Sequence, residues 1–487
     1  MTVSIKLSAF FLSVSLIFFF LGCSRQGNKM NQPEERRPNV LFIAVDDLRP
    51  QLNCYGYSQM ISPNIDRMAQ QGLLFSRAYC QVPVCGASRA SLLTGLRPTR
   101  NRFLDYDTRV AEEVPDALTL PMHFKNNGYY TISNGKVFHH LNDMSDSWSE
   151  KPWHPIQTDS TKNWLDYALE ENLIFASQNS SGRGPAYEMA DVADTAYFDG
   201  KIAKKTISDL QRLKDQDQPF FLAVGFMKPH LPFNAPKKYW DLYEPDDLVM
   251  APNPFRPEGA PDAAMHNWGE LRNYNNIPEK GPLSAEMSRK LVHGYYACVS
   301  YTDAQIGKLL DAIEALDLAD NTIVILWGDH GWNLGEHGLW CKHCNFETSL
   351  RAPLMIKVPG IEGGKQTNAL TEFVDIYPSL CELTGLPVPH HLQGMSFVPL
   401  LTNPDQPWKE YAFSKWFNGF SIKNDRYRYT EWSRKDSNAV TEYARMLYDH
   451  VTDSLENHNI AEGPQNQELI RQMSDRLRQE WKEDFTP

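Results

Sequence analysis

Short apolar runs that alternate with longer amphipathic segments restrict the fold of this chain more than any other feature. Four runs rich in β-branched and aromatic residues occupy positions 40–45, 129–133, 220–226 and 322–327. Between the last two runs, apolar residues recur at helical spacing at Leu291, Tyr295, Val299, Ile306, Leu310 and Ile313. We therefore predict an α/β fold in which helices cover both sides of a large, mostly parallel sheet.

Charged and imidazole side chains follow each of these four runs. They are Asp46 and Asp47 after the first run, Lys136 and His139 after the second, Lys228 and His230 after the third, and Asp329 and His330 after the fourth. Ligands of open α/β sheets bind at the carboxyl ends of the strands. We therefore expect these side chains to meet in one site at a single edge of the sheet.

The pattern changes in the C-terminal part of the chain. Short aromatic-rich runs, EYAFSKW, GFSIKND, YRYTEW and RMLYD, are separated there by polar turns, which predicts a small antiparallel sheet. Residues 466–485 place Leu469, Met473, Leu477 and Trp481 four residues apart, which predicts a terminal helix that packs on this sheet. We therefore divide the chain into a main domain, residues 38–405, and a C-terminal α+β subdomain, residues 406–487.

The N-terminus has the pattern of an exported lipoprotein. Residues 1–22 contain Lys6 and an apolar stretch that is short for a membrane span, as in a signal peptide. The ending FLGCS resembles a bacterial lipoprotein cleavage box with Cys23 as the acylated residue, although Phe20 stands where leucine is usual. A plain cleaved signal and an uncleaved anchor are the alternatives. We predict a polar tether over residues 23–37 and a location in the periplasm or outer membrane of a bacterium.

The net charge limits the partners of this protein. The chain of 487 residues carries a formal charge of −12, which argues against non-specific binding to nucleic acid. An anionic ligand must therefore be held by a local cluster of cations.

The cysteines have no clustered spacing from which disulfides could be assigned, and the single CKHC pair at 341–344 lacks the second half of a zinc site.

Asp46 and Asp47 are adjacent carboxylates, which repel each other unless a cation compensates them. The simplest interpretation of such a pair is an exposed turn in which one side chain caps a helix. Because Asp329 and His330 are expected at the same edge, a bound metal explains all four residues better. Carboxylate oxygens favour Ca²⁺ or Mg²⁺, whereas zinc more typically takes further imidazole or thiolate ligands.

Cations and a cysteine complete the predicted site. Lys136, Lys228 and Lys342, together with His139 and His230, describe a pocket for a tetrahedral oxyanion, with imidazoles placed for proton transfer. In the stretch VPVCGASRASLLTG, residues 82–95, Cys85 precedes a predicted helix start, and Arg89 follows one turn later. A thiolate suits a hard metal poorly, so we expect Cys85 to be converted into another group.

The segment CGASR followed by ASLLTG resembles the type I sulfatase signature, in which the cysteine is oxidised to Cα-formylglycine. Further stretches resemble one branch of this family in particular, the iduronate-2-sulfatase-like branch within the alkaline phosphatase superfamily. They are NVLFIAVDDLRPQLNCYG, GKVFHH, FFLAVGFMKPHLPF, DHGWNLGEHGLWCKHCNFE and GFSIKNDRYRYTEW. Ala87 stands where proline is commoner, which implies a bacterial maturation system that accepts alanine. Leu96 stands where the family commonly has an arginine, and Arg97 follows it. We assign the role of that arginine to neither residue.

The resemblance implies a role for every residue of the predicted site except Lys228. The metal, Ca²⁺ with Mg²⁺ as the alternative, would be held by Asp46, Asp47, Asp329, His330 and the modified Cys85. Hydrated formylglycine would attack sulfur, while Arg89, Lys136 and Lys342 neutralise the sulfate. His230 would protonate the departing sugar oxygen, and His139 would take a proton from the second hydroxyl to expel sulfate. The choice of His139 over His140 follows from the spacing of the resemblance alone.

The expected activity is hydrolysis of O-sulfate esters in sulfated polysaccharide fragments, with 2-O-sulfated uronic acid as the sugar. The expected partners are a sulfated oligosaccharide and a formylglycine-generating maturase. The candidate sugar contacts are Trp332, Trp340 and His343, although aromatic residues next to a site serve packing as often. The alternatives are a sulfatase for algal glycans, a phosphoester or phosphonate hydrolase of the same superfamily, and a non-catalytic glycan-binding lipoprotein.

Overall fold

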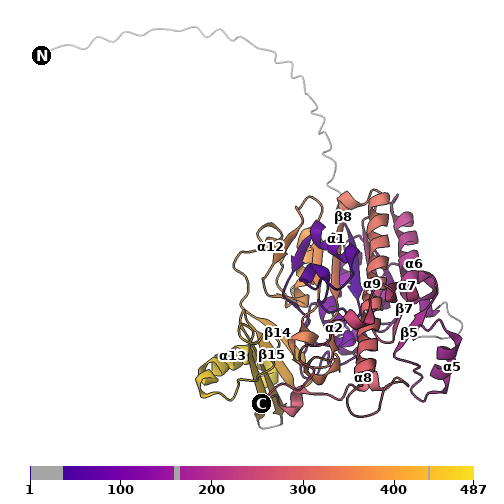
Figure 1. Ribbon diagram of the computed structural model, residues 1–487. Coiled ribbons are helices and arrows are strands. Elements are labelled where there is room, and N and C mark those ends of the chain that lie inside the picture. The colour runs from indigo at the N-terminus through magenta and orange to yellow at the C-terminus, as the bar shows by residue number, and fades with distance from the viewer. Residues whose placement is uncertain (2–36, 158–164, 437–438, 487) are drawn as a thin grey trace, which may run out of the picture. The chain divides into compact units, whose positions relative to one another are not determined.

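The computed structural model describes residue 1 and residues 37–157, 165–436 and 439–486. The predicted signal peptide and tether, including Cys23, lie outside this part of the chain apart from Met1 and Arg37. The described residues from Arg37 onward form one compact unit, shown in Figure 1. Among the described residues, no helix has the length and apolar character needed to cross a membrane.

A seven-stranded sheet with the order β12-β2-β11-β8-β1-β6-β4 forms the centre of this unit. Its strands are β1 (Asn39–Val45), β2 (Leu73–Phe75), β4 (Tyr130–Gly135), β6 (Phe220–Phe226), β8 (Thr322–Gly328), β11 (Leu354–Lys357) and β12 (Lys365–Thr367). The neighbours β4, β6, β1 and β8 are parallel, whereas β11 runs antiparallel to β8 and β2. The predicted mostly parallel sheet is confirmed, and the four predicted runs form its adjacent parallel strands β4, β6, β1 and β8.

Helices cover both faces of the sheet because its buried strands carry apolar side chains on both sides. Leu41 and Ile43 of β1 belong to the apolar core on one face, and Val40 and Phe42 to the core on the other. The first face is covered by α1 (Pro63–Gln71), α6 (Phe198–Leu213) and α9 (Ala285–Ala315), and the second by α2 (Cys85–Thr94), α4 (Leu120–Asn126) and α11 (Ile376–Leu383). Helices α6 and α9 lie side by side at the right of Figure 1.

The predicted helix between the third and fourth runs is α9, and its start is set by a side-chain cap. The Ser284 hydroxyl accepts a hydrogen bond from the Met287 amide at 3.1 Å. The remaining elements are short: α3 (Val110–Glu113), α5 (Glu170–Gln178), α7 (Lys237–Trp240), α8 (Gly269–Arg272), α10 (Glu347–Leu350), α12 (Val398–Thr402), α14 (Lys482–Phe485), β3 (Ala78–Tyr79), β5 (Tyr187–Ala190), β7 (Phe233–Pro236), β9 (Asn333–Leu334), β10 (Trp340–Cys341) and β13 (Thr371–Glu372).

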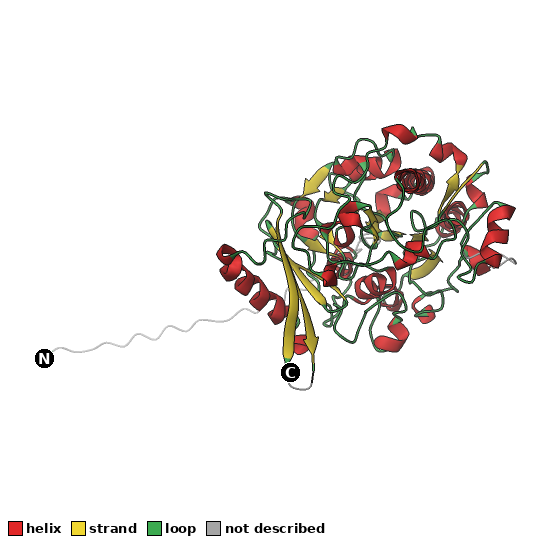
Figure 2. Cartoon of the chain, turned by 60° about the horizontal axis from the view of Figure 1, so that its bottom comes forward, coloured by secondary structure: helices red, strands yellow, loops and turns green. Residues whose placement is uncertain are grey.

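The C-terminal part forms the predicted four-stranded antiparallel sheet. Its strands are β14 (Ala412–Trp416), β15 (Gly419–Lys423), β16 (Tyr427–Lys435) and β17 (Val440–Asp449), in that order. Helix α13 (Gln467–Glu480) packs on this sheet through Ile470, Met473 and Leu477. The long strands stand beside the C-terminus in Figure 2.

Candidate active site

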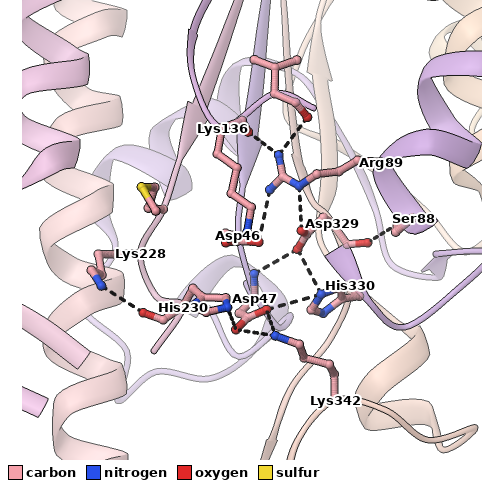
Figure 3. A network of polar contacts seen from close by, with 12 residues as sticks. Asp46, Asp47, Ser88, Arg89, Lys136, Lys228, His230, Asp329, His330 and Lys342 are labelled. Carbon is pink, nitrogen blue, oxygen red and sulfur yellow. Dashed lines mark hydrogen bonds and ion pairs between the residues drawn. The ribbon is translucent and has the colours of Figure 1, made fainter. Parts of the chain in front are cut away.

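The carboxylates predicted to bind metal meet at the carboxyl ends of β1 and β8. Because the two strands are parallel neighbours, the residues that follow them leave the sheet together. The Asp329 amide donates to the Val45 carbonyl at 3.1 Å, and the Asp47 amide donates to the Asp329 carboxylate at 3.0 Å. Asp46, Asp47 and Asp329 are fully buried, and Figure 3 shows their side chains converging.

This cluster has the donors that a hard divalent metal needs. One oxygen from each of Asp46, Asp47 and Asp329 lies within 4.8 Å of the others. Nε2 of His330 lies 3.3 Å from Oδ1 of Asp47, and this buried nitrogen has no hydrogen-bond partner among the described residues. Burial raises the pKa of Asp47 to about 6, so the cations present do not fully compensate its charge. The residues therefore fit a divalent metal.

Two buried cations surround the carboxylates. The Nε of Arg89 lies 2.9 Å from Asp329 and its Nη2 lies 3.4 Å from Asp46, while Nζ of Lys136 lies 2.5 Å from Asp46. Lys136 reaches this position because the chain passes close to β6 after β4. A Cβ at Gly225 of β6 would lie 1.8 Å from the Lys136 carbonyl, so only glycine permits the approach.

Cys85 is the first residue of α2, and its side chain lines the same site as these cations. The sulfur of Cys85, one ring nitrogen of His330 and one carboxylate oxygen of Asp329 lie within 4.8 Å of one another. Burial alone would raise the pKa of the Cys85 thiol, but the positive charges of Lys136, His139 and Lys342 hold that pKa well below its usual range. The site therefore favours negative charge at residue 85.

A cavity of about 570 Å³ opens above the carboxylates and is lined by Cys85, Lys136, His139, His230 and Lys342. Nζ of Lys342 lies 3.1 Å from Oδ1 of Asp47, and Nε2 of His230 lies 3.9 Å from Oδ2 of the same residue. The structure thus brings together the ten residues for which the sequence predicted a catalytic or metal-binding position.

The structure gives the two adjacent histidines different surroundings, although their ring centres are 4.9 Å apart. His139 lines the cavity, and its Nδ1 has no hydrogen-bond partner in the described part of the chain. The Nε2 of His140 instead lies 3.3 Å from the carbonyl of Asp107, outside the cavity lining. Geometry therefore agrees with the choice of His139.

Three other expectations are wrong in detail. Lys228 lines the cavity, but its ammonium donates to the carbonyls of His230 and Pro232 at 3.1 and 2.7 Å, so it does not face the carboxylates. The predicted sugar contacts Trp332 and Trp340 are buried, at 1% and 5% exposure, because their rings pack in the core. Of the three aromatic candidates, only His343 lines the cavity.

The sequence reasoning missed one member of the site, Glu270 of the short helix α8. Its Oε1 lies 3.0 Å from Nε2 of His230 and 2.9 Å from Nζ of Lys342. Glu270 stands in a segment without strand or helix periodicity, 40 residues after His230, and no sequence pattern marks it.

The sequence matches models of known protein families along most of its length. The sulfatase family model matches residues 38–386, and a model named N-sulphoglucosamine sulphohydrolase, C-terminal, matches residues 335–483. The iduronate 2-sulfatase of Mus musculus is 34% identical over 89% of this chain and 93% of its own. An ulvan-active sulfatase of Formosa agariphila is 29% identical over 98% of this chain and 88% of its own.

Among solved structures, a phosphonate monoester hydrolase of Agrobacterium radiobacter superposes with a TM-score of 0.74 at 22% identity, covering 92% of this chain and 96% of that one. This likeness concerns the fold. A mostly parallel sheet with carboxylates, cations and histidines at its strand ends suits the hydrolysis of an anionic ester. The chain belongs to the sulfatase family, and it is an enzyme that hydrolyses sulfate esters.

Proposed function

We propose that this sulfatase removes 2-O-sulfate from uronic acid residues of sulfated polysaccharide fragments, with a formylglycine at position 85 as its nucleophile. The placement of Cys85 carries the mechanistic part of the proposal. It opens α2 beside three buried carboxylates, where Arg89, Lys136 and Lys342 favour negative charge. The iduronate 2-sulfatase relative, similar over most of both chains, supports the choice of sugar.

Two groups would supply chemistry that the amino acids lack. Formation of an aldehyde at Cys85 would require a maturase, and the hydrated aldehyde would offer one hydroxyl to attack sulfur and a second whose deprotonation would expel sulfate and restore the aldehyde. A divalent metal, which we propose to be Ca²⁺ with Mg²⁺ as the alternative, would be held by Asp46, Asp47, Asp329, His330 and the modified Cys85, and would polarise the sulfate oxygens.

The remaining residues bind the sulfate and move protons. The cations Arg89, Lys136 and Lys342 lie at the carboxylate cluster and would neutralise the negative charge of the sulfate group. His230 would give a proton to the sugar oxygen as its bond to sulfur breaks. His139, whose Nδ1 has no other partner among the described residues, would take the proton of the second hydroxyl as sulfate leaves.

A second candidate substrate is an algal sulfated glycan. The ulvan-active relative, 29% identical over almost the whole chain, favours it. Both candidates share the site chemistry described above and differ in the sugar that enters the cavity. We also propose export through the N-terminal signal and acylation of Cys23, on the strength of the sequence alone.

The test is sulfate release by matured protein in which peptide mass has verified formylglycine at position 85. The substrates are a 2-O-sulfated iduronate disaccharide, ulvan oligosaccharides and a phenyl phosphonate monoester. Release from the disaccharide supports the first proposal, and release from ulvan alone favours the second. Hydrolysis of the phosphonate without any sulfate release would contradict both.

A further inference from the structure

We propose that Glu270 is a positioning residue that holds His230 and Lys342 in their working orientation. This inference rests on the proposed function, in which His230 protonates the departing oxygen and Lys342 binds sulfate. It assigns a task to a carboxylate that would otherwise be unfavourable in a cavity for an anionic substrate, because like charges repel.

The contacts of Glu270 join two segments that are distant in sequence. Oε1 lies 3.0 Å from Nε2 of His230, which follows β6, and 2.9 Å from Nζ of Lys342, which follows β10. The Lys342 ammonium is shared with Asp47, at 3.1 and 3.2 Å from its two oxygens. One carboxylate oxygen therefore links the proposed proton donor to a cation that touches the carboxylate cluster.

The local structure fixes Glu270 in place. Helix α8 packs against β10, and the indole nitrogen of Trp268, directly before α8, donates to the Gly338 carbonyl at 3.0 Å. At the other end of α8, the Arg272 guanidinium stacks on the Trp268 ring at 4.1 Å and donates to the carbonyls of Pro278 and Gly281 at 2.6 and 2.8 Å. The Glu270 side chain is 17% exposed. A carboxylate held in this way can orient its partners, whereas a mobile surface carboxylate cannot.

The ring of His230 has both nitrogens engaged as a result. Nδ1 donates to the carbonyl of Leu231 at 2.5 Å, and Nε2 faces the Glu270 carboxylate. The carbonyl contact alone would allow the side chain to tilt, because one hydrogen bond leaves a rotation axis. The second contact directs Nε2 into the cavity, and the proton that Nε2 shares with Glu270 is the one that His230 would give to the departing oxygen.

Lys342 is placed by three neighbours. Its ammonium lies 4.8 Å from the centre of the Trp332 ring, which packs beneath it, and between Asp47 and Glu270. Without Glu270, the attraction of Asp47 would be unopposed and would draw the ammonium toward the metal ligands. Glu270 therefore keeps the ammonium over the cavity, where a sulfate oxygen can reach it.

The experiment compares two substrates that differ in how much they need an acid. A sugar sulfate has a poor leaving oxygen and depends on proton donation, whereas 4-nitrophenyl sulfate releases a stable phenolate. We expect E270A to lower kcat on the sugar sulfate by about 30-fold to 100-fold more than on 4-nitrophenyl sulfate, a part of the usual contribution of a general acid. A shared loss on both substrates reports the displacement of Lys342.

E270Q keeps the shape of the side chain and an oxygen that can accept from His230. We expect it to recover at least part of the selective loss, and it carries the test if E270A does not fold. The matched control is E258Q, because Glu258 forms a Glu–His ion pair of 2.9 Å with His458 on the exposed surface. This control should retain the wild-type kcat on both substrates.

The outcomes separate this inference from the proposed function. If the wild-type protein releases no sulfate from either substrate, the proposed function fails. If the wild type is active on both substrates and folded Glu270 variants lose activity equally on both, Glu270 does not position His230 and the inference as stated fails. No loss on either substrate overturns it for Lys342 as well. Melting temperatures measured for each variant distinguish a general loss of stability from the selective loss.

Discussion

Arg89 lies 240 residues before Asp329 in the sequence, yet its Nε is 2.9 Å from the Asp329 carboxylate, with both side chains fully buried. The same guanidinium reaches Asp46 at 3.4 Å and donates to the carbonyl of Val137 at 3.1 Å. One planar side chain therefore joins α2 to the ends of β1, β4 and β8. A fork with several donors can make these contacts, but the single ammonium of lysine cannot.

We expect R89K to lower kcat for sulfate release by about 100-fold or more, because removal of one charge-stabilising donor in an active site typically costs that much. The unfolding free energy should fall by about 1.5–3 kcal/mol, the usual worth of a hydrogen bond to a charged group. The control is R426K, since Arg426 forms a similar fork with Asp449 at 50% exposure. Wild-type turnover by R89K would contradict the role of the fork.

Cys85 provides the second prediction. C85A should abolish sulfate release, because alanine cannot be converted into an aldehyde, while the melting temperature stays close to that of the wild type. The loss of one sulfur atom at the start of α2 should change the unfolding free energy by about 1 kcal/mol at most. C80A removes another buried thiol, which lies outside the cavity lining, and should leave turnover intact. Normal turnover by C85A would refute the nucleophile.

The sheet and most of the site could be predicted because both depend on local patterns. Strands such as 220–226 are continuous apolar runs, and parallel strands place the residues that follow them at one edge. Asp46, Asp47, Asp329 and His330 follow such runs directly, so their convergence required no knowledge of loops. Cys85 and Arg89 needed both a predicted helix start and the resemblance, since the helix that carries them does not follow a strand of the main sheet.

The remainder could not be predicted because it depends on where loops return. Glu270 lies in a loop-rich segment, and its contact with His230 depends on the packing of α8 against β10. Lys228 has the same sequence context as Lys136, but it turns to the carbonyls of its own segment. Trp332 and Trp340 stand next to site residues in the sequence, but their rings pack in the core. Whether such a ring faces the cavity or the core depends on the direction of its side chain, which the sequence pattern does not give.

Metal removal provides the third prediction. Chelation should abolish sulfate release and lower the melting temperature, and restored Ca²⁺ should reverse both effects. A free metal concentration of about 100 times the dissociation constant adds about 2.7 kcal/mol to the free energy of unfolding. D329N should reduce the bound metal measured by elemental analysis, because it replaces a buried carboxylate of the cluster with a neutral amide. D311N alters an aspartate that is 65% exposed and should bind metal as the wild type does. A D329N protein with full metal content would exclude this site.

Acid sensitivity provides the fourth prediction, which concerns Glu372, a residue at 1% exposure. Burial alone would raise its pKa, but Arg97 and Lys409 lower that pKa from 4.5 to about 2. Lys409 lies 2.8 Å from the carboxylate, and one Arg97 nitrogen lies 2.8 Å from the same oxygen. The lowered pKa means that folding favours the charged form. Glu372 therefore contributes stability above about pH 4.5 and loses it as the pH falls toward 2.

E372Q should remove this contribution, which a shift of this size puts at about 3 kcal/mol near pH 7. The unfolding free energy of the variant, measured by urea titration, should be lower than that of the wild type at pH 7, and the two should converge as the pH approaches 2. E468Q alters a glutamate that pairs with Arg471 on the surface, at 62% exposure, and should follow the wild-type curve. A constant difference between E372Q and the wild type from pH 7 to pH 2 would mean that the ionisation of Glu372 does not stabilise the fold.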